Sequence, residues 1–317
     1  MLLYSVLLLV GFLILFKSAD QFVIGSIATA KNLNISPMVI GLTVVALGTS
    51  APEIFVAAAA SLRGEPELAI GNAIGSNIAN LGMVLGVTAI LVPLPFRPEV
   101  LKNDLPIMIF VTLCAGVTLL DLKLTMIDGV VLLSGLVMFL VRVGIDSKNN
   151  EDCAGFDELQ EIPDMPMRSA VRNLILSLVF LLLSAELLVF SVVEIAKYMG
   201  VSELIIGLTV IAIGTSLPEL VVSVTSALKG QTDLAIGNIL GSNIFNLLAV
   251  LAIPCLLSPV EFDLDLLLRD YGLMLGMTLI VALFAYGIFT KPRIARLEGL
   301  LLIFVWFGYL AYLYNST

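Results

Sequence analysis

The sequence predicts an all-α membrane protein with ten transmembrane helices, arranged as two inverted repeats of five helices each. Three observations support this prediction. Hydrophobic residues make up 59% of the 317 residues and charged residues only 13%, whereas a soluble domain has about 25% charged residues. The apolar residues form continuous runs of about 20 residues, which indicates helices rather than a barrel. The two halves of the chain also resemble each other in sequence.

Ten apolar runs give the expected membrane spans. The first run has no basic leader and no small-residue cleavage site, so we interpret it as a transmembrane helix rather than a removable signal peptide. The first run of each half covers about 30 residues, or ~45 Å of helix, which predicts a steep tilt across a ~30 Å hydrocarbon core. In chain order the runs are 2–31, 37–61, 68–92, 104–120, 126–144, 169–198, 203–227, 234–258, 267–289 and 295–314.

The longest polar break divides the chain into two sets of five spans. We expect a first five-helix repeat at 1–145, a cytoplasmic acidic linker at 146–168 and a second, inverted five-helix repeat at 169–317. The linker lacks the D-x-D-x-D-G spacing of a calcium-binding loop, so we interpret it as a solvated connection.

The repeat is clearest in two polar stretches. GLTVVALGTSAPE (41–53) recurs as GLTVIAIGTSLPE (207–219), and LAIGNAIGSNIANL (68–81) recurs as LAIGNILGSNIFNL (234–247). Both pairs have the same offset of 166 residues, without a gap, and the identities include the polar positions. Five spans separate equivalent points, and five is odd, so the second half is expected to lie upside down relative to the first. This arrangement is typical of secondary transporters.

The distribution of lysine and arginine gives the expected orientation. If the linker lies in the cytoplasm, four basic residues outside the first span fall on the external side: Arg63, Lys123, Lys197 and Arg269. The remaining eleven fall inside, as the positive-inside rule requires. We therefore expect a multi-pass protein of the cell (inner) membrane with both termini external.

Hydroxyl and carboxylate side chains share one helix face in each copy of the first stretch, because they follow spacings of three and four. Pro52 and Pro218 cannot donate a backbone hydrogen bond, so each is expected to kink its helix and to free a carbonyl oxygen. Such oxygen ligands suit sodium and calcium. The two sets are Ala46, Thr49, Ser50 and Glu53, and Ala212, Thr215, Ser216 and Glu219.

The second stretch is expected to supply a facing wall of polar side chains at i, i+4 and i+8. Small G-x-x-x-G pairs lie beside these side chains and would let the helices approach closely. The polar sets are Asn72, Ser76 and Asn80, and Asn238, Ser242 and Asn246, beside Gly71 and Gly75, and Gly237 and Gly241.

Glu53 and Glu219 indicate a cation-binding function, because each lies deep in a predicted membrane span. A carboxylate deep in a membrane span costs ~2.5–3.5 kcal/mol on insertion scales and is functional by default. If Glu53 and Glu219 meet in a low dielectric, they repel each other, and one divalent cation or several sodium ions or protons would remove the repulsion. The equivalent pair Asp20 and Glu186 is interpreted as a set of polar contacts that anchor helices.

At these residues the sequence resembles the calcium/cation antiporter superfamily, specifically the prokaryotic sodium/calcium exchangers. The matching motifs are G-x-x-x-x-A-x-G-T-S-x-P-E and G-N-x-x-G-S-N-I-x-N, each present twice, and the resemblance covers nearly the whole chain. It implies exchange of sodium for calcium by alternating access, with these ions as substrates and no cofactor. The implied ligands are Ala46 (through its carbonyl), Thr49, Ser50, Glu53, Ser76, Asn80, Ala212, Thr215, Ser216, Glu219, Ser242 and Asn246.

Departures from the family pattern concern the coupling ion. Asn246 stands where certain members have aspartate, so this site would hold two central carboxylates rather than three. Proton-coupled members typically have an acidic residue at the position of Gly75 and Gly241, and this chain has no histidine. Sodium is therefore favoured, and the alternative is an antiporter of protons against calcium or another divalent cation.

Other function classes fit the sequence less well. An intramembrane hydrolase needs distinct acid and base groups, whereas the two glutamate stretches are near copies. A channel typically repeats in parallel around a pore. The expected partners are the lipid bilayer and the ions; neither enzymatic activity nor nucleic-acid binding is expected, and a monomer is the expected form.

Overall fold

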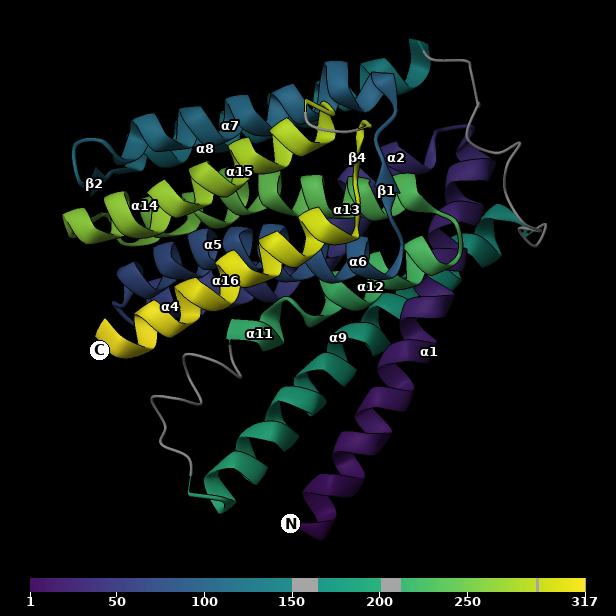
Figure 1. Cartoon of the computed structure of the whole chain (residues 1–317), viewed down its shortest axis with the longest axis horizontal. Coiled ribbons are helices and arrows are strands. Elements are labelled where there is room, and N and C mark those ends of the chain that lie inside the picture. Colours follow the sequence, from purple (N-terminus) through teal and green to yellow (C-terminus); the bar gives the residue numbers. More distant parts are fainter. Residues whose placement is uncertain (150–164, 201–211, 289–290, 317) are drawn as a thin grey trace.

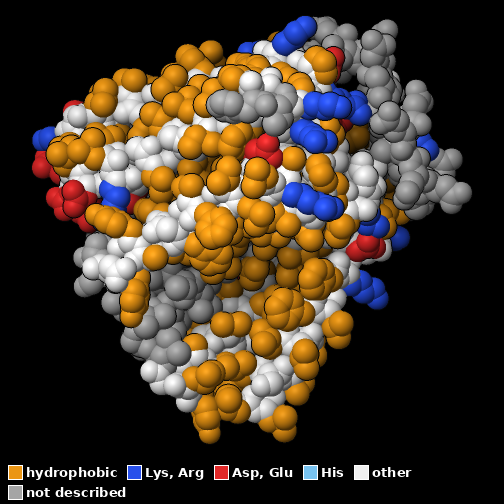
Figure 2. Space-filling model, viewed as in Figure 1, with side chains coloured by type: hydrophobic (Ala, Val, Ile, Leu, Met, Phe, Trp, Pro, Cys, Tyr) orange, Lys and Arg blue, Asp and Glu red, His pale blue; other side chains and the backbone are white. Residues whose placement is uncertain are grey.

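The computed structural model describes residues 1–149, 165–200, 212–288 and 291–316 of the chain. In this part of the protein, eight helices are long and apolar enough to cross a membrane, and a bent pair raises the number to nine. The predicted span 203–227 lies partly outside the described residues. Apolar side chains cover most of the face in Figure 2, and many large ones are exposed, such as Phe55 and Phe110. So large an apolar surface suits lipid rather than water, and the chain is a multi-pass membrane protein.

Helices α1 (Leu2–Leu33) and α9 (Met167–Tyr198) form a pair that extends away from the other helices in Figure 1. Each has 32 residues, or about 48 Å of helix, so the predicted long first helix of each half is confirmed. Gly11 lies against Leu188 and Gly25 lies against Leu174. The two helices therefore run antiparallel.

The second predicted span is a broken helix. Its first arm consists of α2 (Pro37–Ile40), the π-helical turn η1 (Gly41–Val45) and α3 (Ala46–Thr49), and its second arm is α4 (Ala51–Leu62). Ser50 separates the arms, with φ −81° and ψ 8°, and the arms differ in direction by 42°. The predicted kink next to Pro52 is confirmed.

The second half repeats this break. Helix α11 (Ala212–Thr215) and helix α12 (Leu217–Leu228) are separated by Ser216, with φ −89° and ψ 7°. Pro218 lies in the first turn of α12, where the missing N–H has no partner to lose.

The third span of each half passes through a π-helical turn. In the first half, α5 (Pro66–Ala79), η2 (Asn80–Val84) and α6 (Leu85–Leu91) follow one another. In the second half the order is α13 (Thr232–Phe245), η5 (Asn246–Val250) and α14 (Ala252–Leu257).

Four further spans pack around this core. Two of them begin with a π-helical turn. They are η3 (Val100–Asp104) with α7 (Leu105–Leu119), α8 (Met126–Asn149), η6 (Leu266–Tyr271) with α15 (Gly272–Ala285), and α16 (Arg296–Ser316).

Two short antiparallel sheets each join the two halves of the chain. Strand β1 (Leu94–Pro95) pairs with β4 (Arg293–Ile294), and β2 (Lys123–Leu124) pairs with β3 (Val260–Glu261). The labels of the two sheets lie at different ends of the helix layers in Figure 1. In the second sheet, the hydrogen bond from Lys123 to Glu261, at 2.5 Å, raises the pKa of the lysine.

Glycines let α13 press against the first arm of the broken helix. A Cβ atom at Gly237 would lie 2.7 Å from the carbonyl oxygen of Met38, and one at Gly241 would lie 2.6 Å from that of Leu42. The predicted role of this G-x-x-x-G pair is confirmed. Its copy differs, because a Cβ atom at Gly71 or Gly75 would meet no described atom within 4 Å. The segment that corresponds to the first arm, 203–211, lies outside the described residues.

This difference gives a prediction. A Gly241→Ala substitution places a methyl group 2.6 Å from the Cβ atom of Ala46, so we expect a loss of about 1–3 kcal/mol in the free energy of unfolding. Thermal unfolding of the detergent-solubilised protein measures it. Gly75→Ala is the matched control, since alanine is also a better helix former than glycine. An unchanged free energy of unfolding in the Gly241→Ala variant would contradict the close packing of α13 against Ala46 and Leu42.

Candidate functional site

The predicted site residues are buried where the broken helices meet α5 and α13. Glu53 is 0% exposed and Glu219 is 1% exposed. Thr215 is only half-buried, and the side chain of Ala212 lies outside the described residues. The other predicted ligands are all buried: Ala46, Thr49, Ser50, Ser76, Asn80, Ser216, Ser242 and Asn246.

Polar contacts between the two halves bring these residues together. Ser50 Oγ donates a hydrogen bond to Glu219 Oε1 at 3.0 Å. Thr49 Oγ1 lies 3.5 Å from Ser242 Oγ. Glu53 lies beside Ser76 and close enough to Glu219 for the two carboxylates to repel each other. The structure therefore gathers side chains from both copies of both motifs.

Several buried oxygen atoms of this group have no hydrogen-bond partner in the described part of the chain. They are Glu53 Oε1 and Oε2, Glu219 Oε2, Asn80 Oδ1, Ser216 Oγ and Asn246 Oδ1. Burying an ionised carboxylate without a partner is costly, and a bound cation removes that cost. The described residues contain no cluster of three or more Asp, Glu or Cys side chains that could hold a metal. The donor set is therefore two carboxylates with neutral oxygens, which suits hard cations.

Asn72 and Asn238, the first polar residues of the two facing walls, donate hydrogen bonds to backbone carbonyl oxygens of the broken helices. Asn72 Nδ2 donates to the carbonyl oxygen of Glu53 at 3.0 Å. Asn238 Nδ2 donates to Ser223 Oγ at 2.9 Å and to the carbonyl oxygen of Glu219 at 3.4 Å, and its Oδ1 accepts from Thr49 at 3.0 Å. The sequence grouped these residues with the ligand walls, whereas in the structure they tie α4 to α5 and α12 to α13.

The π-helical turns are a feature that the sequence analysis missed. Turns η2 and η5 begin at Asn80 and Asn246, the last polar residue of each copy of the second motif. Such single π turns occur frequently at functional sites, because they change the direction of a side chain within a helix. No pattern of residues in the sequence predicted these turns. Their equivalent positions in the two halves follow from the repeat.

Within the described residues, the two halves do not make the same hydrogen bonds. The hydroxyls of Thr49 and Ser50 are both hydrogen-bonded across the site. In contrast, Ser216 Oγ has no hydrogen-bond partner within the described ranges, and Thr215 is half-buried. Helix α9 covers both breaks, since Leu178 lies against Gly48 and Val189 lies against Gly214.

The predicted anchoring role is confirmed for Asp20 but not for Glu186. Asp20 Oδ1 of α1 lies 2.6 Å from Nζ of Lys229, the residue that follows α12. Glu186, its counterpart on α9, is exposed and makes no ion pair in the described part of the chain.

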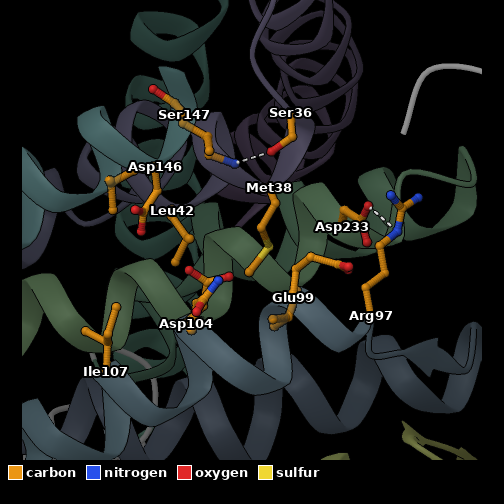
Figure 3. A pocket seen from close by; sticks show the side chains of 14 residues that line it. Ser36, Met38, Leu42, Arg97, Glu99, Asp104, Ile107, Asp146, Ser147 and Asp233 are labelled. Carbon is orange, nitrogen blue, oxygen red and sulfur yellow. Dashed lines mark hydrogen bonds and ion pairs between the residues drawn. The ribbon is translucent and has the colours of Figure 1, made fainter. Parts of the chain in front are cut away.

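A cavity of about 300 Å³ lies beside the first arm of the broken helix (Figure 3). Its wall includes Leu42 together with Glu99, Asp104 and Asp146. Arg97 at its edge forms an ion pair of 2.9 Å with a fourth acid, Asp233. Asp146 is also paired, with Arg142 at 3.4 Å, so basic side chains partly neutralise the acids around this cavity.

Comparison with known proteins adds to this geometry. The family described as sodium/calcium exchanger protein matches residues 3–144 and 170–315. A protein of Alkalimonas amylolytica that is proposed to be an antiporter, CaxA, is 44% identical, with all of both chains covered. Inner membrane protein YrbG of Escherichia coli is 39% identical, over 99% of this chain and 98% of its own.

The fold is also shared with a solved exchanger. A structure of the sodium-calcium exchanger NCX_Mj superimposes with a TM-score of 0.84 at 34% identity, over 98% of both chains. The match covers both halves of the chain. The chain therefore belongs to the sodium/calcium exchanger protein family, a family of membrane transporters rather than of enzymes.

Proposed function

We propose that the protein is a secondary active antiporter that exchanges sodium for calcium by alternating access, with Glu53 and Glu219 at the centre of its cation site. The main support is the meeting of two buried carboxylates, one from each half, with three of their four oxygens lacking a hydrogen-bond partner in the described structure. One calcium ion neutralises both charges, and so do two monovalent cations. Each set of ions can therefore replace the other.

The proposed ligand set is the one that the family resemblance implies. Hydroxyl and amide oxygens complete the coordination that two carboxylates begin, and no resident cofactor is needed because the ions are the substrates. The set comprises Ala46, Thr49, Ser50, Glu53, Ser76, Asn80, Ala212, Thr215, Ser216, Glu219, Ser242 and Asn246.

The proposed topology is ten helices in two inverted repeats, 1–145 and 169–317, joined by the cytoplasmic linker 146–168. Helices α1 and α9 are equivalent in the repeat and run antiparallel, which supports the inversion. The two sheets support it as well, because each pairs a strand of one half with a strand of the other. Both termini would then be external. Most Lys and Arg side chains visible in Figure 2 gather in one region, as the positive-inside rule requires of a cytoplasmic face.

Alternating access is proposed to use the α1–α9 pair, of which α9 covers both helix breaks. The offset of 166 that relates Asp20 to Glu186 also relates Arg63 to Lys229. The Asp20–Lys229 ion pair, 2.6 Å long in this structure, therefore has a counterpart in Glu186 and Arg63, both exposed here. We propose that the two ion pairs alternate, one closing as the other opens, when the halves exchange conformations.

The alternative is exchange of protons for calcium or another divalent cation. Two buried carboxylates also accept protons when no cation is bound. The names of two relatives differ on the coupling ion. MaX1 of Methanosarcina acetivorans, 32% identical over 97% of both chains, is named a sodium/calcium exchanger. The name of CaxA says only that it is an antiporter and gives no ion.

A flux experiment separates these functions. Purified protein in sodium-loaded vesicles, diluted into calcium-45 without sodium, is expected to take up calcium in proportion to the sodium gradient. Vesicles loaded with potassium at equal ionic strength are the control. Uptake driven by a pH gradient alone would indicate the proton antiporter, and uptake without any counter-gradient would indicate a channel.

A further inference from the structure

Each half contains one more buried asparagine, three residues before the proposed ligand in the second motif. Asn77 precedes Asn80 and is 1% exposed, and Asn243 precedes Asn246 and is 2% exposed. The offset of 166 relates these two residues to each other. Neither belongs to the proposed ligand set.

The orientation of the Asn77 amide is fixed by its surroundings. Its Nδ2 donates to the backbone carbonyl oxygen of Asn243 at 3.3 Å. A backbone carbonyl only accepts hydrogen bonds, so the amide nitrogen of Asn77 must face it. The Oδ1 atom of Asn77 is therefore the end that faces Asn246.

Asn77 in turn fixes the orientation of Asn246. Asn246 Nδ2 donates to Asn77 Oδ1 at 3.1 Å. If the Asn246 amide were reversed, its acceptor oxygen would meet the acceptor oxygen of Asn77, and the hydrogen bond would be lost. In the observed orientation, Oδ1 of Asn246 is buried and free of hydrogen bonds to the described residues, and so it is available as a cation ligand.

We propose that Asn77 is a positioning residue that holds the Asn246 carboxamide with its oxygen toward the transported cation. This inference rests on the proposed function, in which the site binds calcium. Asn77 does not touch the ion; it prevents Asn246 from presenting its NH₂ group, which would repel cations and leave the site one oxygen short.

The other half has the same parts. Asn243 Nδ2 donates to the carbonyl oxygen of Ile239 at 2.7 Å, which leaves its Oδ1 as an acceptor. That Oδ1 and Nδ2 of Asn80 are both buried without a hydrogen-bond partner among the described residues. These two atoms are the repeat counterparts of the bonded pair, so we expect Asn243 to position Asn80 in the conformation in which this bond forms. In the described structure, the bond is made in one half only.

The test is a double-mutant cycle read as calcium affinity. Asn77→Leu keeps the size of the side chain and removes the acceptor. We expect it to raise the dissociation constant for calcium by about 10-fold or more, as measured by equilibrium dialysis of the purified full-length protein with calcium-45. Asn246→Ala is expected to have a similar effect. The double variant is expected to lose no more affinity than the worse single variant, because Asn77 acts through Asn246.

Thr88→Val is the matched control. Thr88 lies in the same span, is buried and donates only to the carbonyl oxygen of Val84 in its own helix, so its removal should leave calcium affinity unchanged. If Asn77→Leu does not fold, Asn77→Ser, which moves the acceptor out of reach, gives the same test. Unchanged affinity in the Asn77 variant, or losses that add in the double variant, would overturn the positioning role. Failure of the unaltered protein to bind calcium would overturn the proposed function itself and the positioning role with it.

Discussion

Replacement of Glu53 by glutamine is expected to abolish sodium-dependent calcium uptake. The substitution keeps the shape of the side chain and removes one of the two charges that would face the cation in the proposed site. A unit charge about 4 Å from a monovalent ion is worth about 4 kcal/mol at an effective dielectric constant of 20, which corresponds to roughly a thousandfold in affinity. The loss for a divalent ion is larger still. Glu219→Gln is expected to have the same effect, since both carboxylates are fully buried.

The same variants should not be less stable than the unaltered protein. A buried carboxylate without partners destabilises the fold in the absence of an ion, and a neutral amide relieves that strain. We therefore expect the unfolding temperature in sodium- and calcium-free detergent solution to stay the same or to rise. Glu67→Gln, an exposed position in the first turn of α5, is the control for uptake. Full uptake by either site variant would contradict the role of paired carboxylates.

The core of the site could be predicted because polar groups stand out in an apolar chain. Glu53 and Glu219 lie in runs where any charge is unfavourable, so composition alone singles them out. The repeat then supplied their partners, because one offset relates every polar residue of the two motifs. The broken helix was predictable for a similar reason, since Pro52 cannot donate the backbone hydrogen bond that would continue the first arm into α4 as one regular helix.

Other features depend on which residues meet in space, and a repeat does not specify this. Gly237 and Gly241 press against the first arm of the broken helix, whereas Gly71 and Gly75 have the same sequence context without such a contact in the described structure. The amide bond from Asn246 to Asn77 and the missing counterpart in the other half also differ between identical motifs. The amide bond is made in one half and not in the other among the described residues, although the two halves are near copies in sequence.

Covalent linkage of residue 20 to residue 229 is expected to stop transport. Asp20 and Lys229 join α1 to the end of α12 at 2.6 Å in this structure, and the proposed exchange of conformations requires them to separate. Because the pair is partly exposed, with side chains 41% and 35% accessible, its own attraction is worth only about 0–1 kcal/mol. Asp20→Asn should therefore change the transport rate by a few-fold at most, whereas a covalent link prevents the motion altogether.

The linkage experiment uses Asp20→Cys with Lys229→Cys, after the three native cysteines have been replaced by alanine. A short, cleavable bifunctional thiol reagent is preferable to a direct disulfide, which needs Cα atoms about 4.4–6.8 Å apart. Calcium-45 uptake should fall to background on linkage and return after cleavage. Asp20→Cys alone, treated with the same reagent, is the control.

Glu186 and Arg63, the repeat counterparts of Asp20 and Lys229, test whether the two ion pairs alternate during transport or only anchor the helices. In a protein with Glu186→Cys and Arg63→Cys, cross-linking should occur only in the fraction of molecules that has left the conformation described here, and it should also stop transport. Each pair should therefore protect against linkage of the other in a variant that carries all four cysteines. If both pairs were linked in the same molecule, or if linked protein still carried calcium, the ion pairs would be anchors that stay in place during transport. If the two inverted halves exchange conformations during transport, only one of the two pairs can be linked in any one molecule.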